Sequence, residues 1–224
     1  IPEDHIFPMG KFEGLCRYVL EQEIIHESDI IAPGMVDMAS LFSVHTRRYT
    51  EGIISGSLER KELRRLGLPW SHRLAVRSRL AVQGTINAAL MALQDGVSGN
   101  LAGGTHHAMP DRGEGFCVFN DVAIAIKVLR QSMWARKTLV IDCDVHQGNG
   151  TAEIFKDSPD VFTFSIHGEN NYPFKKPPSS LDIGLPDGTG DKEYLTVLGD
   201  ALDIIFNRID PDLVFYLGGI DPLE

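Results

Sequence analysis

The stretch TLVIDCDVHQGNG, residues 138–150, begins with residues suited to a buried strand and ends as a polar turn. Asp142, Asp144 and His146 stand at every second position where the apolar run stops. Side chains two residues apart on an extended chain point to the same face, so these three project together. Glycines follow directly and allow the chain to bend. The stretch therefore predicts a buried strand with a polar cluster at its carboxyl end.

Three more apolar runs have the composition of strands that are covered on both faces: NLAGG near 100–104, VFTFSI at 161–166 and LVFYLGG at 213–219. Between the runs, apolar residues recur every three or four positions, which predicts helices over 72–93, 119–134 and 191–209. Asn120 or Asp121 is able to cap the second helix. The segment 175–191 is rich in Pro, Gly and Ser, and it is expected to be a loop. Strands that alternate with helices predict an α/β fold with a mainly parallel sheet.

Composition and charge exclude several classes of protein. The 224 residues carry a formal net charge of −10, so long-range attraction to nucleic acid or to an anionic membrane is not expected. No apolar run reaches the roughly 18 residues that a membrane span needs, and no signal-peptide pattern is present. The 3 cysteines lack paired spacing, which favours a reducing compartment and a cytoplasmic protein. The basic residues between 47 and 79 are interpreted as a solvated helical face, not as a DNA-binding site.

A polar cluster follows each apolar run: GGTHHA, DCDVHQGNG, SIHGENN and GGIDP. Ligands of open α/β sheets bind beyond the carboxyl ends of the strands, so we expect the clusters to converge. The carboxylates of Asp142 and Asp144 repel each other unless a cation lies between them. His146 adds an imidazole, and Asp221 completes a set with one open position, the pattern of catalytic zinc. The alternative interpretation is a solvated polar turn.

His106 and His107 form a second candidate group. A pair of histidines is most often a surface or core feature, but after two glycines at a strand end it suits acid/base chemistry beside a metal. One imidazole can take a proton from water and return it to a leaving amine. Each ring needs an orienting partner, for which Asp142 and Asn149 are the candidates. Phe116 is either core or the wall of a cleft.

Six segments together resemble the histone deacetylase family of zinc amidohydrolases: HIFPMGKF, GGTHHA, GEGFCVFNDVAIAI, LVIDCDVHQGNGT, FTFSIHG and YLGGIDPLE. The resemblance implies the arginase-deacetylase fold, a three-layer αβα domain with a mainly parallel sheet. DRGEGFC and GGIDPLE are similar to bacterial and class IV-like members. Residues 1–224 are then expected to be a single deacetylase catalytic domain that is incomplete at its C-terminus, since the chain begins at Ile1 and stops just after an apolar run.

The resemblance also implies a role for each polar residue of the site. The expected zinc ligands are Asp144, His146 and Asp221. His107 would be the general base that takes a proton from water and then serves as the acid for the departing amine. His106, buttressed by Asp142, would be an electrostatic partner, and Asn149 would orient His107.

A structural potassium ion and a substrate tunnel are implied as well. The potassium ligands would be Asp142, the Ser165 hydroxyl and the backbone carbonyls of Asp144, His146 and Ile166. The tunnel for the acyl-lysine would be formed by Gly115, Phe116 and Tyr172.

Two departures bear on substrate and activity. The family's transition-state tyrosine lies beyond Glu224, and the segment 63–73 has none of the acidic residues with which several members grip the substrate backbone. The expected substrate is an acylated lysine of a protein; the alternatives are an acetylated polyamine or other small amine, and an inactive homologue that only binds. An arginase-like pair of metal ions is not expected, because Gly148 stands where a bridging carboxylate would be.

Overall fold

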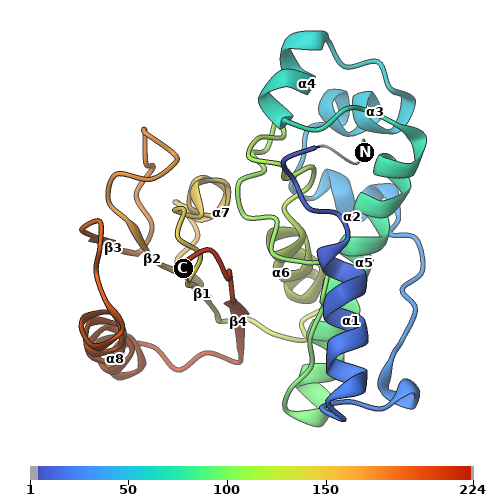
Figure 1. The fold of residues 1–224 in the computed structure, drawn as a ribbon. Helices are drawn as coiled ribbons and strands as arrows, with labels where there is room; N and C mark the ends of the chain where they lie inside the picture. The colour runs from blue at the N-terminus through green and yellow to red at the C-terminus, as the bar shows by residue number, and fades with distance from the viewer. Residues whose placement is uncertain (1–4, 223–224) are drawn as a thin grey trace. The chain divides into compact units, whose positions relative to one another are not determined.

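The computed structural model describes residues 5–222, and the chain divides into two compact units (Figure 1). The first unit ends at Ala125 and the second begins at Ile126, inside helix α6 (Asp121–Gln131). The single domain expected over residues 1–224 stays a prediction. No helix within residues 5–222 is both long and apolar enough to cross a membrane.

The first unit is built around the long helix α5 (His72–Asp95). Ser71 caps this helix, because its hydroxyl accepts the backbone N–H of Leu74 at 3.1 Å. The buried face of α5 includes Leu74, Val82 and Ile86. The remaining helices of this unit are α1 (Lys11–Glu21), the 3₁₀ helix η1 (Glu27–Asp29), α2 (Met38–Phe42), α3 (Arg47–Ser55) and α4 (Arg60–Leu66).

The strand predicted over residues 100–104 is wrong, since this segment consists of turn and coil. The side-chain oxygen of Asn100 accepts the N–H of Ala102 at 3.0 Å, and its amide donates to the Ala81 carbonyl at 2.8 Å. A short polar side chain that bonds to nearby backbone stabilises a turn in place of a strand.

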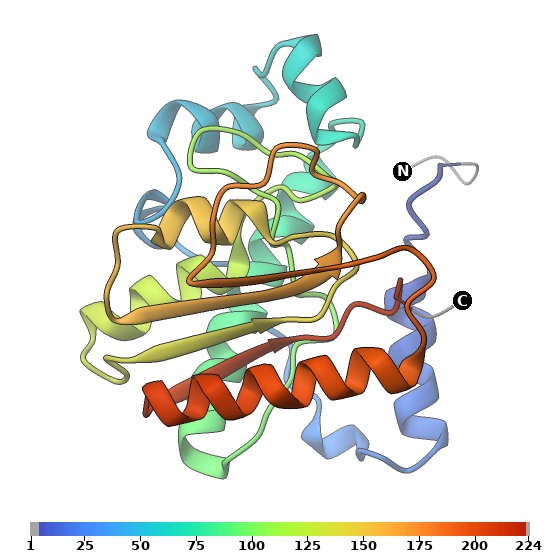
Figure 2. The same ribbon diagram turned by 90° about the vertical axis from the view of Figure 1, so that its left-hand side faces the viewer.

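The second unit is a parallel four-stranded sheet in the order β3-β2-β1-β4 (Figure 2). Its strands are β1 (Thr138–Asp142), β2 (Val161–Gly168), β3 (Leu181–Leu185) and β4 (Leu213–Leu217). Three of them confirm predicted strands, and the predicted α/β fold with a parallel sheet is confirmed. β3 lies in the segment that was expected to be a loop. Its sequence, LDIGL, contains Asp182 and Gly184, so it lacks the continuous apolar run from which the other three strands were predicted.

Helices cover both faces of this sheet (Figures 1 and 2). Helix α7 (Asn149–Phe155) connects β1 to β2 on one face, and α8 (Asp191–Arg208) connects β3 to β4 on the other. The core under α8 consists of Leu139, Ile141, Cys143, Phe164, Ile166, Leu185, Ala201 and Ile205. The helices predicted over 72–93, 119–134 and 191–209 correspond to α5, α6 and α8.

The sheet has a switch point between β1 and β4. The chain runs from β1 outward to β2 and β3, and then returns through α8 to β4 on the other side of β1. Loops that leave such neighbouring strands diverge and leave a crevice beyond their carboxyl ends, which is where ligands of α/β sheets bind. The fold therefore predicts a ligand site at the carboxyl ends of β1 and β4.

Candidate metal centre and histidine pair

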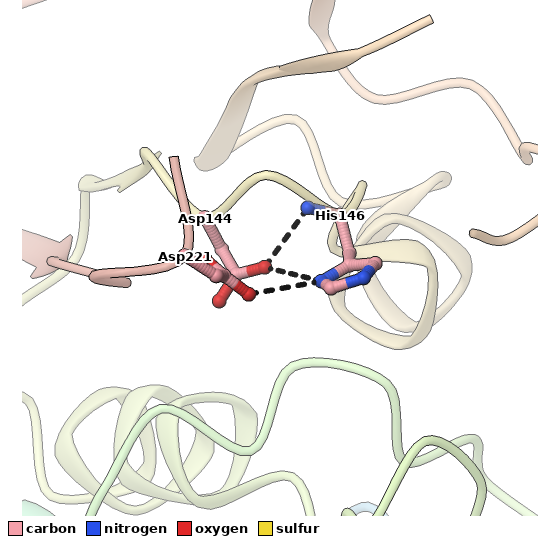
Figure 3. A group of neighbouring side chains, drawn as sticks. All are labelled: Asp144, His146 and Asp221. Atoms are coloured by element: carbon pink, nitrogen blue, oxygen red, sulfur yellow. Dashed lines mark hydrogen bonds and ion pairs between the residues drawn. The ribbon is translucent and has the colours of Figure 1, made fainter. Parts of the chain in front are cut away.

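Asp144, His146 and Asp221 meet beyond the carboxyl ends of β1 and β4 (Figure 3). The two strands are parallel neighbours in which Asp142 is aligned with Leu217, so the residues that follow them leave the sheet at the same level. One ligand atom from each of the three side chains lies within 4.8 Å of the others. Two carboxylates and an imidazole are donors that zinc accepts, and the spacing suits a single ion.

The two carboxylates face the same ring nitrogen of His146 (Figure 3). Its Nδ1 is 2.9 Å from Oδ1 of Asp144 and 3.1 Å from Oδ2 of Asp221. The hydrogen bond to Asp144, followed by that to Asp221, raises the pKa of His146 to about 9, although burial acts in the opposite direction. This arrangement attracts positive charge, which a divalent cation would supply in place of the proton.

Backbone N–H groups orient both carboxylates. Oδ1 of Asp144 accepts the N–H of His146 at 2.9 Å, and Oδ1 of Asp221 accepts the N–H of Val145 at 3.2 Å. All three side chains are only partly buried, with exposed fractions of 21% for Asp144, 36% for His146 and 40% for Asp221. The group is therefore held in place while part of each side chain remains accessible to solvent.

Gly219 allows the end of β4 to approach the end of β1. A Cβ atom at this position would lie 2.5 Å from Oδ2 and 2.9 Å from Cα of Asp144. No real Cβ atom approaches backbone so closely, so a larger residue would separate the two chain segments. Gly219 stands in the GGIDP segment, but the sequence alone did not predict this role for it.

Asp142 and Ser165, two of the expected potassium ligands, are aligned on neighbouring strands. Both are buried, and Ile166 follows on β2 inside the core. Oδ1 of Asp142 accepts the N–H of Asp144 at 3.2 Å, which connects this buried pair to the metal group. The Ser165 hydroxyl lies 3.0 Å from Nδ1 of His167. Asp142 and Ser165 are thus neighbours on adjacent strands, and potassium binding stays a prediction.

Tyr172 lies against His146, with ring centroids 6.4 Å apart and the planes at 67°. The loop that carries it is held by Lys176, whose ammonium group donates to the carbonyls of Glu169, Asn171 and Pro173 at 3.1, 2.7 and 2.8 Å. An ammonium with three carbonyl acceptors has its hydrogen-bonding capacity filled. Lys176 was missed in the sequence, where it was one of two adjacent lysines in a segment assigned to a loop.

His106 and His107 are both buried in the first unit. Their Nε2 atoms are 3.1 Å apart and their ring centroids 4.0 Å apart. One Nε2 must carry a hydrogen and the other must accept it, so the two rings share one hydrogen bond. Their expected orienting partners, Asp142 and Asn149, are buried residues of the second unit, and these roles stay predictions.

Gly115 packs beside this pair in the first unit, and Phe116 follows it in the chain. A Cβ atom on Gly115, whose φ is +57°, would lie 2.5 Å from Cδ2 of His107. Phe116 also has a positive φ, of 63°, and its ring contacts Phe7 and the position of Gly67. A positive φ in a bulky residue is uncommon and clusters at functional sites. The assignment of both residues to a substrate tunnel stays a prediction.

Comparison with known proteins identifies relatives over the whole described chain. Residues 5–224 match the sequence profile of the histone deacetylase domain. An uncharacterized protein of Picosynechococcus is 47% identical over 99% of this chain and 74% of its own length. A probable deacetylase of Methanothermobacter thermautotrophicus is 32% identical over 98% of this chain and 70% of its own.

The fold is similar to that of an HDAC homologue that was crystallised in complex with SAHA. The TM-score is 0.86 at 28% identity, over 99% of this chain and 65% of the other. This similarity confirms the predicted arginase-deacetylase fold. The chain spans somewhat less than two thirds of the length of that solved relative.

Proposed function

Because the chain belongs to the histone deacetylase family, we propose that it is a zinc-dependent amidohydrolase that removes acetyl or other acyl groups from lysine side chains. The observation that carries this proposal is the metal group, in which donor atoms of Asp144, His146 and Asp221 lie within 4.8 Å of one another. Two carboxylates and one imidazole leave a coordination position open, as catalytic zinc requires. One ion per chain is proposed.

The chemistry divides between the metal group and the histidine pair. Asp144, His146 and Asp221 would hold the zinc ion, which would supply a Lewis acid for the activation of water and the polarisation of the amide carbonyl. His107 takes the proton of the attacking water and later gives it to the departing lysine amine. His106 stabilises the charge that His107 acquires, Asp142 buttresses His106, and Asn149 orients His107. The shared hydrogen bond between the two imidazoles, at 3.1 Å, supports their acting as a unit.

The remaining residues of the site are assigned to support and to substrate binding. Asp142, Ser165 and the carbonyl of Ile166 belong to the proposed potassium site, together with the carbonyls of Asp144 and His146. Gly115, Phe116 and Tyr172 form the proposed tunnel for the acyl-lysine stem. The contact between the rings of Tyr172 and His146 supports its place beside the metal. A cytoplasmic location remains part of the proposal.

Zinc analysis and hydrolysis assays on the full-length protein test the function. The native protein is expected to contain one zinc per chain and to release acetate from a fluorogenic acetyl-lysine peptide. His107→Ala is expected to keep its zinc and to lose about 10²–10⁴-fold in kcat, the usual contribution of a general base. A His107→Ala protein with a near-native rate would show that the base is another residue.

A substrate panel distinguishes the proposal from its alternatives. The segment 63–73 contains no acidic residue, which permits acetylated polyamines and other small amines as the alternative substrate class. Faster turnover of such amines than of the peptide would show that the substrate belongs to that class, while the proposed reaction would stay the same. Bound zinc without turnover of any acyl amine would instead identify a binding homologue.

A further inference from the structure

The segment 103–109 carries both histidines but has no regular secondary structure beyond a single bridge at Met109. Such a segment is not held by the repeated hydrogen bonds of a helix or a strand. Its buried N–H and C=O groups still need partners. Backbone carbonyls accept the N–H groups of His106 and Met109, and side chains supply further partners. Side-chain contacts to the backbone on either side of the pair therefore hold His106 and His107 in place.

Asp121, the first residue of α6, holds the backbone before the pair. Its Oδ2 accepts the N–H of Gly104 at 3.1 Å, and its Oδ1 accepts the N–H of Thr105 at 2.8 Å. The hydroxyls of Thr105 and of Thr85 on α5 each donate to this carboxylate at 2.5 Å. Asp121 is 1% exposed, and a buried carboxylate is tolerated only with several donors of this kind.

Asn120 holds the backbone at the pair itself. Its amide nitrogen lies 3.4 Å from the carbonyl of His106 and 3.4 Å from that of Ala108, the two residues that flank His107. Its side-chain oxygen accepts the N–H of Ala123 at 3.0 Å, which caps α6. One buried side chain thus joins the start of a helix to both sides of His107.

His45 extends the same network to the end of the segment. Its Nδ1 lies 2.9 Å from the Met109 carbonyl, and its Nε2 lies 3.0 Å from the backbone nitrogen of Asn120. A carbonyl only accepts and a backbone N–H only donates, so the ring is neutral with its hydrogen on Nδ1. Burial lowers the pKa of His45 to about 4, which keeps this arrangement intact at neutral pH.

We propose that Asn120 is a positioning residue for the deacetylation, which directs the His106 and His107 imidazoles through the backbone carbonyls on both sides of His107. Asp121 and His45 anchor the two ends of the same segment. This role rests on the proposed function, in which His107 moves the proton. It differs from simple capping, because only the amide nitrogen of Asn120 reaches the flanking carbonyls.

The substitution Asn120→Ser separates positioning from capping. Serine is a preferred capping residue, so α6 keeps its cap, whereas the shorter side chain has no amide to reach the carbonyls of residues 106 and 108. The matched control is Ser71→Ala, which removes the equivalent cap of α5 and leaves the segment 103–109 untouched. Asn120→Asp, which keeps both volume and cap acceptor, makes the same test if the serine variant does not fold.

Steady-state kinetics on the full-length zinc protein give the first readout. Asn120→Ser is expected to lower kcat about 10- to 100-fold with little change in KM, since a misplacement of about 1 Å has an effect of this order. Ser71→Ala is expected to lower the thermal midpoint without lowering kcat. An Asn120→Ser protein with the parent kcat overturns the proposal.

Nuclear magnetic resonance of ¹⁵N-labelled histidines gives a second readout, which does not depend on turnover. The ring signals of His106 and His107 are expected to shift in Asn120→Ser and to stay unchanged in Ser71→Ala. Unchanged signals in Asn120→Ser overturn the positioning role. If the parent protein hydrolyses no acyl amine, the proposed function fails, while the histidine signals still decide whether Asn120 directs the pair.

Discussion

Asp144, His146 and Asp221 follow strands, whereas His106 and His107 stand in a segment with almost no regular structure. The register of β1 and β4 brings the first group together, and its members are partly open to solvent. The second group is buried, and side chains such as Asn120 and Asp121 bond to its backbone. Repeated backbone hydrogen bonds thus position the side chains of the metal group, whereas single buried side chains position the histidine pair.

This difference predicts which substitutions and conditions should disturb each region. A sheet distributes its hydrogen bonds over many residues, so only changes at the ligands or at the point of closest approach should disturb the metal group. A loop held by a few side chains should respond to the loss of any one of them, and to acid if one of them titrates.

The largest effect is expected from Asp221→Ala, which removes the ligand that β4 contributes. Zinc affinity is expected to fall by more than about 100-fold. Removing a residue that only hydrogen-bonds to a metal ligand already lowers affinity by up to about 100-fold, and loss of a ligand should cost more. Titration of the metal-free protein with zinc in a competing chelator measures this change. Glu224→Ala, three residues further along the chain, is the control. Near-native affinity in Asp221→Ala would mean that Asp221 is not a ligand.

Acid is expected to weaken the first unit through His45. The folded pKa of about 4 lies below the ordinary value of 6.5, so between these pH values the unfolded state binds more protons. Stability from this group is therefore complete above pH 6.5 and is lost as pH falls toward 4, by about 3 kcal/mol in all. Urea unfolding from pH 7 to pH 4, compared with His45→Gln, measures the loss. An identical pH dependence in both proteins would contradict it.

A smaller effect is expected from Gly219→Ala. The added methyl group would meet Asp144, and overpacking of this kind costs about 1–3 kcal/mol. The end of β4 must shift, so zinc affinity should also fall, although all three ligands are still present. Gly218→Ala is the control, since the atoms nearest to its methyl group would belong to the exposed ring of Tyr216, at 3.0 Å. Equal zinc affinity in the two variants would show that close approach of the strands is not required.

Much of the fold was predictable because the elements concerned are regular and buried. Continuous apolar runs predicted β1, β2 and β4, and helical periodicity predicted α5 and α8 to within two residues at each end. β3 was missed because its sequence, LDIGL, contains Asp182 and Gly184 and so has no such run. The strand expected near Asn100 failed because the side chain of Asn100 bonds to the neighbouring backbone. Local side-chain chemistry of this kind overrides a short apolar pattern.

Part of the candidate site was likewise predictable from the sequence, and part was not. The alternation of Asp144 and His146 after an apolar run was visible in the sequence, because residues two apart on an extended chain share a face. That Asp221 joins them could be drawn from residue types and from the family resemblance, but not from geometry. The sequence did not predict the close approach at Gly219 or the hydrogen bonds of Lys176 and Asn120. Each of these depends on atoms that the folded chain brings into contact.

The sequence by itself determined which residues have the chemistry for a metal and for proton transfer, because side-chain type and strand periodicity are local properties. Only the tertiary structure decided that β4 lies beside β1, so that Asp221 reaches the other two ligands. Only the tertiary structure decided, too, that buried side chains hold the backbone around His107. Strand order and such long-range hydrogen bonds follow from how the whole chain packs, and no short stretch of sequence specifies them.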